Sequence, residues 1–140
     1  MAINNYNHVV GFSTVKSNNG HVHAFFHDGR SMMDLGTLSG GMADSDYSVA
    51  LGVNNKDQVV GYTYLPGVGE MPLQQVAFLW NRSGTGTAKM VNLNNLLNET
   101  GKGYVLISAT AINDYGQIVA NAYDIYNGGV RSVLLIPVKQ

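Results

Sequence analysis

The sequence predicts an all-β domain of three repeats, each with about four short antiparallel strands. Seventeen glycines against only three prolines, with frequent Val, Ile, Tyr and Thr, are typical of short strands joined by tight turns. No segment keeps a helical period beyond two turns, and the best helical candidate, residues 91–102, is rich in Asn, a poor helix former. Nearly the same stretch also recurs three times, as "NNYNHVVGF" at 4–12, "NNKDQVVGY" at 54–62 and "NDYGQIVAN" at 113–121.

The recurring stretch predicts a hairpin. Asn and Asp tolerate left-handed backbone and hydrogen-bond to their own backbone, so an Asn-Asn or Asn-Asp corner favours a tight reversal between antiparallel strands. The glycine after the valine pair, Gly11 or Gly61, predicts a β-bulge or a close approach of two backbones. Ala120 stands at this place in the third copy.

Two further strands follow each hairpin. "HAFF" at 23–26 corresponds to "VAFL" at 76–79 and, more weakly, to "SVLL" at 132–135. "MDL" at 33–35 is then matched by "VNL" at 91–93. We therefore expect a single domain whose repeats span approximately residues 1–45, 46–98 and 99–140.

These motifs resemble a known repeat. "INNYNHVVGFS" at 3–13, "HAFFHDGRSMMDLGTLSGG" at 23–41 and "VNNKDQVVGYT" at 53–63 are similar to the extracellular HAF-family repeat, which pairs an INxxGxVVG-like hairpin with an HAF strand and a DLGTLGG-like stretch. The resemblance implies a bacterial extracellular or cell-envelope protein, built of propeller-like blades and of unknown biochemical activity. A β-trefoil is the alternative architecture, because three units of four strands also match its length.

Composition argues against several classes of partner. The formal net charge is −1, the sequence pI is near 6.4, and the eight Lys and Arg are scattered, which argues against nucleic acid and anionic membrane surfaces. No apolar run approaches the roughly 18 residues of a membrane span, and the first ten residues lack a signal-peptide pattern. The absence of cysteine excludes disulfides and Cys-ligated zinc.

The sequence offers no clear catalytic or metal site. Glu70 and Glu99 are the only glutamates, and no carboxylate pair stands out as acid and base, so we expect no enzyme activity and no cofactor. His21 and His23 would project from one face of a strand, where two imidazoles can hold a metal ion. A site of this type needs a third ligand, and the second repeat has Val76 in place of His23, so we expect solvated histidines and no metal.

Aromatic residues carry the remaining functional signal. Five of them fall at or near strand ends, where rings can face loops and solvent and bind sugars or peptides: Tyr62, Tyr64, Trp80, Tyr123 and Tyr126. The alternative is that these rings pack between neighbouring β units. The loop at 64–75 is longer than its counterpart at 14–22 and is a natural place for specific binding.

Two functions follow as hypotheses. The first is a non-catalytic binding module, for glycans or cell-envelope partners. The second is a structural, self-assembling β-repeat protein without a small ligand. Because the first and third repeats are incomplete, open blades would leave unpaired strand edges, and we expect self-association or a longer array, a dimer of six blades being the simplest closed case. The strands beside "AINN" and in "SVLLIPV" should lie in that interface.

Overall fold

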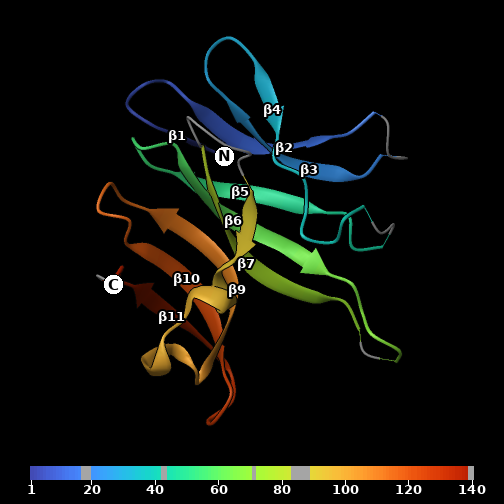
Figure 1. Ribbon diagram of the computed structural model, residues 1–140, viewed down its shortest axis with the longest axis vertical. Helices are drawn as coiled ribbons and strands as arrows, with labels where there is room; N and C mark the ends of the chain where they lie inside the picture. Colours follow the sequence, from blue (N-terminus) through green and yellow to red (C-terminus); the bar gives the residue numbers. More distant parts are fainter. Residues whose placement is uncertain (17–19, 42–43, 71, 83–88, 139–140) are drawn as a thin grey trace.

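The structure, a computed structural model, describes residues 1–16, 20–41, 44–70, 72–82 and 89–138. Three antiparallel sheets, called blades 1 to 3, follow one another along the chain (Figure 1). Blade 1 contains β1 (Ala2–Ile3), β2 (Val9–Thr14), β3 (Val22–His27) and β4 (Met32–Asp34); blade 2 contains β5 (Ser48–Val53), β6 (Gln58–Leu65), β7 (Gln74–Asn81) and β8 (Met90–Asn92); blade 3 contains β9 (Tyr104–Ile112), β10 (Ile118–Asp124) and β11 (Val130–Leu135).

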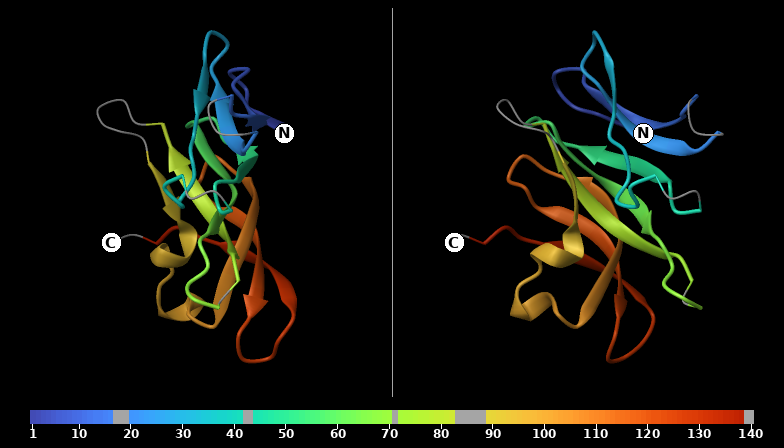
Figure 2. Two further views of the ribbon diagram at one scale, coloured as in Figure 1. Left: turned by 90° about the vertical axis from the view of Figure 1, so that its right-hand side faces the viewer. Right: turned by 45° about the vertical axis from the view of Figure 1, so that its right-hand side comes forward.

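Each blade is a simple meander in which neighbouring strands in the chain pair with one another. The blades stack face to face, with β5 against blade 1 and β9 against blade 2 (Figure 2). The predicted all-β class with short antiparallel repeats is confirmed. In the described part of the chain the three sheets stay separate and do not close one barrel, so the arrangement is blade-like rather than a trefoil.

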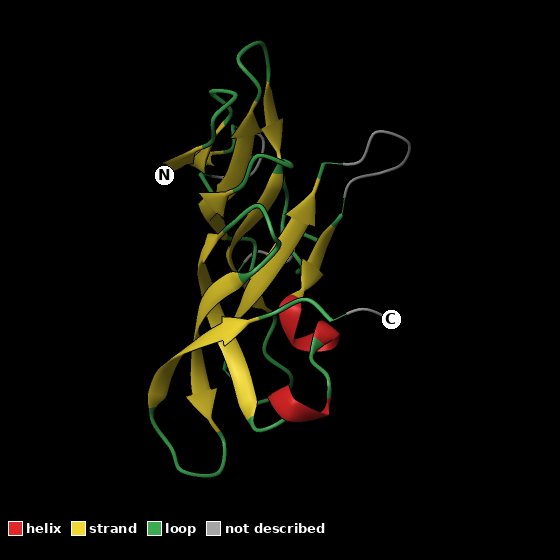
Figure 3. Cartoon of the chain, turned by 90° about the vertical axis from the view of Figure 1, so that its left-hand side faces the viewer, coloured by secondary structure: helices red, strands yellow, loops and turns green. Residues whose placement is uncertain are grey.

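The segment with the best helical pattern forms only two single turns of 3₁₀-helix, η1 (Leu93–Leu96) and η2 (Glu99–Gly101) (Figure 3). The side chain of Asn92 caps η1 and that of Asn98 caps η2, each accepting a backbone N–H two residues later. Asn therefore starts helical turns here, but its preference for such local bonds does not sustain a longer helix.

The corner between the first two strands has the same geometry in all three blades. The Oδ1 atom of Asn4 accepts the backbone N–H groups two and four residues later, at 2.9 and 3.0 Å. Asn54 and Asn113 repeat both bonds. The third residue after this asparagine has a positive φ, which is 64° at Asn7 and 57° at Asp57; in blade 3 this residue is Gly116. The predicted Asn-based hairpin is confirmed.

These corners also bind to one another, in what we call the turn ladder. Asn4 donates its Nδ2 to the carbonyl of Asn54 at 3.0 Å, and Asn54 donates its Nδ2 to the carbonyl of Asn113 at 2.9 Å. A second rung repeats in the same way, from the backbone N–H of the next residue to a side-chain oxygen: Asn5 to Asn55 at 2.8 Å and Asn55 to Asp114 at 2.7 Å. The repeated asparagines therefore shape each turn and join successive blades.

The glycine after the valine pair marks both a bulge and a close approach. In blade 2 the β5–β6 register shifts between Ala50 and Gly52, opposite Gly61. A Cβ on Gly61 would collide with the carbonyl oxygen of Val49 and lie 2.9 Å from a ring carbon of Phe78. Blade 3 has a register shift at the equivalent place in β9–β10, beside Ala120. The sequence-based interpretation of this glycine is confirmed.

The last strand of the third repeat is displaced by one residue from the alignment that the sequence suggests. Val10 pairs with Phe26 and Val60 with Leu79, whereas Val119 pairs with Leu134. Leu134 is thus the counterpart of Phe26, and the alignment of "SVLL" with "HAFF" is wrong by one position. The segment between β10 and β11 differs from the corresponding loops of the other repeats. The pattern of apolar residues alone therefore did not predict which residues of β10 and β11 pair.

Two apolar clusters hold the blades together. The cluster between blades 1 and 2 contains the large rings of Phe26, Phe78 and Trp80. The cluster between blades 2 and 3 consists of aliphatic side chains and alanines, such as Leu106, Ile118 and Ala120. The gap between blades 2 and 3 is therefore filled with smaller groups.

Candidate functional site

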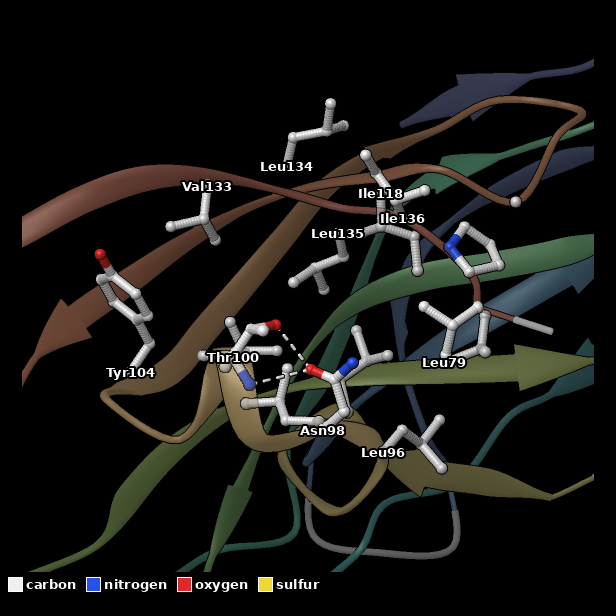
Figure 4. A pocket seen from close by; sticks show the side chains of 17 residues that line it. Leu79, Leu96, Asn98, Thr100, Tyr104, Ile118, Val133, Leu134, Leu135 and Ile136 are labelled. Carbon is white, nitrogen blue, oxygen red and sulfur yellow. Dashed lines mark hydrogen bonds between the residues drawn. The ribbon is translucent and has the colours of Figure 1, made fainter. Parts of the chain in front are cut away.

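A pocket of about 760 Å³ lies in this second gap, between blades 2 and 3. One wall is formed by the inward-facing residues of blade 3, and the other by β7 together with η1 and η2 (Figure 4). The walls include aliphatic side chains from both blades: Leu79, Leu93, Leu97, Leu106, Ile118, Val133 and Leu135.

The pocket exists because two leucines stand where the first gap has two aromatic rings. Phe26 and Trp80 meet between blades 1 and 2 with ring centroids 5.5 Å apart. By strand pairing, Leu79 is the counterpart of Phe26, and Leu135 is the counterpart of Trp80. Both leucines line the pocket. Side chains of lower volume at the same two places leave the space that the rings occupy in the first gap.

Polar groups gather at one side of the pocket. Asn98 accepts the backbone N–H of Thr100 at 3.1 Å and its hydroxyl at 2.6 Å, which holds η2 against the apolar wall (Figure 4). Tyr104 also lines this side. In Figure 4, Val133 and Leu135 point toward η2, whereas Leu134 points the opposite way.

None of the described residues that line the pocket has a charged side chain. Its chemistry is therefore that of an aliphatic pocket with two hydroxyl groups and an amide at the rim. Sequence reasoning missed this site, because leucine carries no chemical signal of its own. The sequence does show that Phe26 of the first repeat is replaced by Leu79 in the second. The replacement of Trp80 by Leu135 in the third repeat was hidden by the one-residue error in the alignment.

Trp80 does not lie where the binding prediction needs it. Its side chain is 2 % exposed and packs in the cluster between blades 1 and 2. The expectation that this ring faces solvent is wrong, because β7 is covered by blade 1 on the face that carries Trp80. The alternative, packing between neighbouring units, applies to this residue.

Tyr62 and Tyr64 form a half-buried cluster with Tyr47. The ring centroids of Tyr47 and Tyr62 lie 6.4 Å apart, and Tyr64 meets both rings edge-on. Burial, with Tyr47 and Tyr64 nearby, raises the pKa of the Tyr62 hydroxyl. The Tyr64 hydroxyl donates to Gln75 at 3.2 Å.

Tyr123 and Tyr126 lie apart from this cluster, in β10 and in the turn that follows it. Tyr123 is on the outer face of blade 3, and the Tyr126 ring lies beside Gly103 and is mostly exposed. The five predicted aromatic residues therefore lie in separate places, and the structure does not bring them together into one surface.

The histidine pair is part of a carboxylate cluster rather than a solvated strand. His23 is 9 % exposed, with Nδ1 at 2.9 Å from an Asp34 oxygen and Nε2 at 2.9 Å from an Asp46 oxygen. His21 also contacts Asp46, at 3.3 Å. The prediction of solvated histidines is wrong for His23, since the loop after β4 folds Asp46 over it. Among the described residues no set of histidines and carboxylates is arranged to hold a metal ion.

Two carboxylates change the proton affinity of the buried imidazole. Burial alone would lower the pKa of His23, but the hydrogen bonds and charges of Asp34 and Asp46 outweigh it and raise this pKa above 6.5. Burial likewise opposes ionisation of Asp46, yet the hydrogen bonds from His23 and Thr37 and the histidine charge lower its pKa below 3.8. The pair therefore favours an imidazolium ion between two carboxylates.

We expect this cluster to make stability depend on pH in a defined direction. The contribution of His23 is complete below its unfolded pKa of 6.5 and is lost as pH rises through its higher folded-state pKa. The contribution of Asp46 is present above its unfolded pKa of 3.8 and is lost as pH falls through its lower folded-state pKa. The free energy of unfolding, measured with urea from about pH 4 to about pH 9, should decline on the alkaline side.

His23→Gln tests the assignment, because it should remove the decline above pH 6.5. His27→Gln is the matched control, since His27 is in the same strand and, among the described residues, accepts a hydrogen bond from the nearby backbone N–H of Gly29 and contacts no carboxylate. An alkaline decline that persists unchanged in His23→Gln would contradict the role of the carboxylate cluster.

Comparison with known proteins gives one match. A family model described as "Protein of unknown function (DUF3466)" matches residues 1–129. No curated protein and no solved structure matches the chain. Within the described residues, no helix has the length and apolar character needed to cross a membrane.

Proposed function

The chain belongs to the DUF3466 family, whose description assigns no activity, and we propose that it is a non-catalytic binding module that holds an aliphatic chain in the pocket between blades 2 and 3. The observation that carries this proposal is the pocket itself, an aliphatic cavity at the place where the neighbouring gap is filled by Phe26 and Trp80.

The size and chemistry of the pocket support an amphiphilic ligand. Sites for small molecules are concave, mostly apolar and about 300–1,000 Å³ in volume, and this pocket falls within that range. Leucine, isoleucine and valine side chains favour a flexible aliphatic chain over a sugar, because sugar sites rely on polar groups and flat aromatic rings. The polar end of the ligand would lie beside Asn98, Thr100 and Tyr104.

The lack of charged side chains among the described residues that line the pocket supports a binding role over catalysis. General acid–base catalysis needs a titratable group within hydrogen-bond reach of the reacting atom. Asn98 and Thr100 are bonded to one another, and neither is next to a base among the described residues that line the pocket. The ligand is therefore held and released unchanged.

The remaining parts of the proposal rest on the sequence. An extracellular or cell-envelope location follows from the HAF resemblance. A glycan or an envelope partner would bind at the cluster of Tyr47, Tyr62 and Tyr64. The rings of this cluster are half-buried and meet edge-on, so they offer little flat area on which a sugar could stack.

Filling the pocket tests the proposal. Leu79→Phe combined with Leu135→Trp recreates in the second gap the ring pair of the first. We expect the natural chain to bind anilinonaphthalene sulfonate, and decanoate to displace this dye and lower its fluorescence. The double variant should bind decanoate at least about tenfold more weakly while remaining folded. Titration calorimetry and circular dichroism measure the two quantities.

Leu73→Phe is the control, because Leu73 is an exposed leucine outside the pocket lining. This variant should bind decanoate as the natural chain does. Equal binding by the pocket-filling variant and the natural chain would refute the site, and failure of the natural chain to bind either probe would refute the aliphatic ligand.

A further inference from the structure

The outer face of blade 3 carries side chains whose counterparts are buried in the other blades. Val119 corresponds to Val10 and Val60, which are both 0 % exposed, yet Val119 is 42 % exposed. Its strand partner Leu134, the counterpart of Phe26, is 56 % exposed. In blades 1 and 2 these positions pack against the next blade. The outer face of blade 3 thus has the apolar pattern of a packing face without a covering blade.

The outer face of blade 1 has the opposite, matching pattern. Ile3 corresponds to Val53, which packs against blade 1, and to Ile112, which packs against blade 2. Ile3 itself is 62 % exposed. Phe25, the counterpart of the fully buried Phe78, also lies on this face beside Gly11. Blade 1 therefore presents the surface with which a blade meets the one before it.

The two ends of the turn ladder carry groups that match one another. Asn54 gives its two Nδ2 hydrogens to Gln58 and to the carbonyl of Asn113. Asn113 gives one to Gln117 at 2.7 Å, and no acceptor among the described residues takes the other. The backbone N–H groups of Asn5 and Asn55 each donate to a side-chain oxygen of the next turn. Among the described residues no such oxygen lies beside the backbone N–H of Asp114. At the other end of the ladder, the carbonyl of Asn4 and the Oδ1 of Asn5 are the corresponding acceptors.

We propose that the outer face of blade 3 binds the outer face of blade 1 in a second copy of this chain. The junction repeats, between molecules, the interface that the chain already forms twice within itself. Val119 and Leu134 of one copy pack on Ile3 and Phe25 of the other. Asn113 and Asp114 then donate to Asn4 and Asn5 of the second copy, which extends the turn ladder by one step.

Two copies are the number that closes this arrangement. The junction is head-to-tail, so it generates a ring if the rotation closes and a filament if it does not. Rings of blades close with about four to eight blades, and two chains of three blades make six. Both apolar faces of each copy are covered in such a ring, as is favourable for an exposed patch of this kind.

Light scattering after size-exclusion chromatography tests the proposal on the natural chain. We expect twice the monomer mass of 15.0 kDa at micromolar to millimolar concentrations. Leu134→Asp and Ile3→Lys each place a charge in the junction and should give folded monomers, with folding checked by circular dichroism. Val68→Asp, at an exposed valine in the loop after β6, should leave the dimer intact.

A mixing experiment distinguishes the head-to-tail junction from other dimers. A Leu134→Asp chain keeps an intact blade 1 face, and an Ile3→Lys chain keeps an intact blade 3 face, so the mixture should recover a dimer that neither variant forms alone. The second junction of that dimer pairs the introduced carboxylate with the introduced amine. A monomeric natural chain, a dimer insensitive to both substitutions, or a mixture that stays monomeric would each overturn the proposal.

Discussion

Trp80→Ala is expected to lower the free energy of unfolding by about 3–5 kcal/mol, the range for removing a large buried ring. Trp80 is 2 % exposed and packs against Phe26 in the cluster that joins blades 1 and 2. Its removal leaves a cavity between two sheets, which cannot collapse without moving their backbones. Urea denaturation followed by circular dichroism measures the loss, since the variant has no tryptophan left to report fluorescence.

The same substitution decides what the ring does. If Trp80 were a surface residue that binds a ligand, its loss would weaken binding and leave stability nearly unchanged. Tyr126→Ala is the control, because the Tyr126 side chain is 81 % exposed and its removal should change stability by less than about 0.5 kcal/mol. Equal stability of Trp80→Ala and Tyr126→Ala would disprove the structural assignment.

Gly61→Ala is expected to destabilise the fold by about 3 kcal/mol, the upper end of the usual cost of overpacking. The added methyl group would collide with the carbonyl oxygen of Val49, which belongs to the backbone of the neighbouring strand. A backbone atom in a paired strand cannot rotate away, so β5 and β6 must separate at the bulge. The ring of Phe78, 2.9 Å from the same methyl carbon, would also have to move.

Gly11→Ala is the matched comparison at the equivalent place in blade 1. There the nearest atoms are the amino-terminal nitrogen, at 3.0 Å, and ring carbons of Phe25, at 3.1 and 3.2 Å. The chain end and the half-buried ring can shift, so we expect a loss of about 1 kcal/mol or less. Thermal or urea unfolding of the two variants, measured together, tests the difference. A loss in Gly11→Ala equal to or larger than that in Gly61→Ala would contradict this account of the bulge.

The sequence predicted the turns well because their geometry depends on a few adjacent residues. Asn54 and Asn113 shape their turns through bonds to N–H groups two and four residues away, which any copy of the motif can form. The strand periods and the glycine of the bulge are similarly local. The all-β class and the hairpins followed from these signals.

Contacts between blades were less accessible to sequence reasoning. Asp46, for example, closes over His23 from 23 residues away and makes that imidazole part of an ion cluster. The one-residue displacement at Leu134 depends on the length and shape of the segment before β11, which repeat comparison does not measure. The candidate pocket appears only when Leu79 and Leu135, from different blades, are placed opposite one another.

The sequence by itself thus determined the repeated hairpins, the all-β class and the positions of the Asn corners, because neighbouring residues form those bonds. Only the tertiary structure decided that Trp80 is a core residue, that the corners form a ladder, and that a pocket lies between blades 2 and 3. The physical reason is that packing between sheets depends on the volume of side chains that meet across a gap. Residues far apart in the chain set that volume, and no local pattern records which of them face one another.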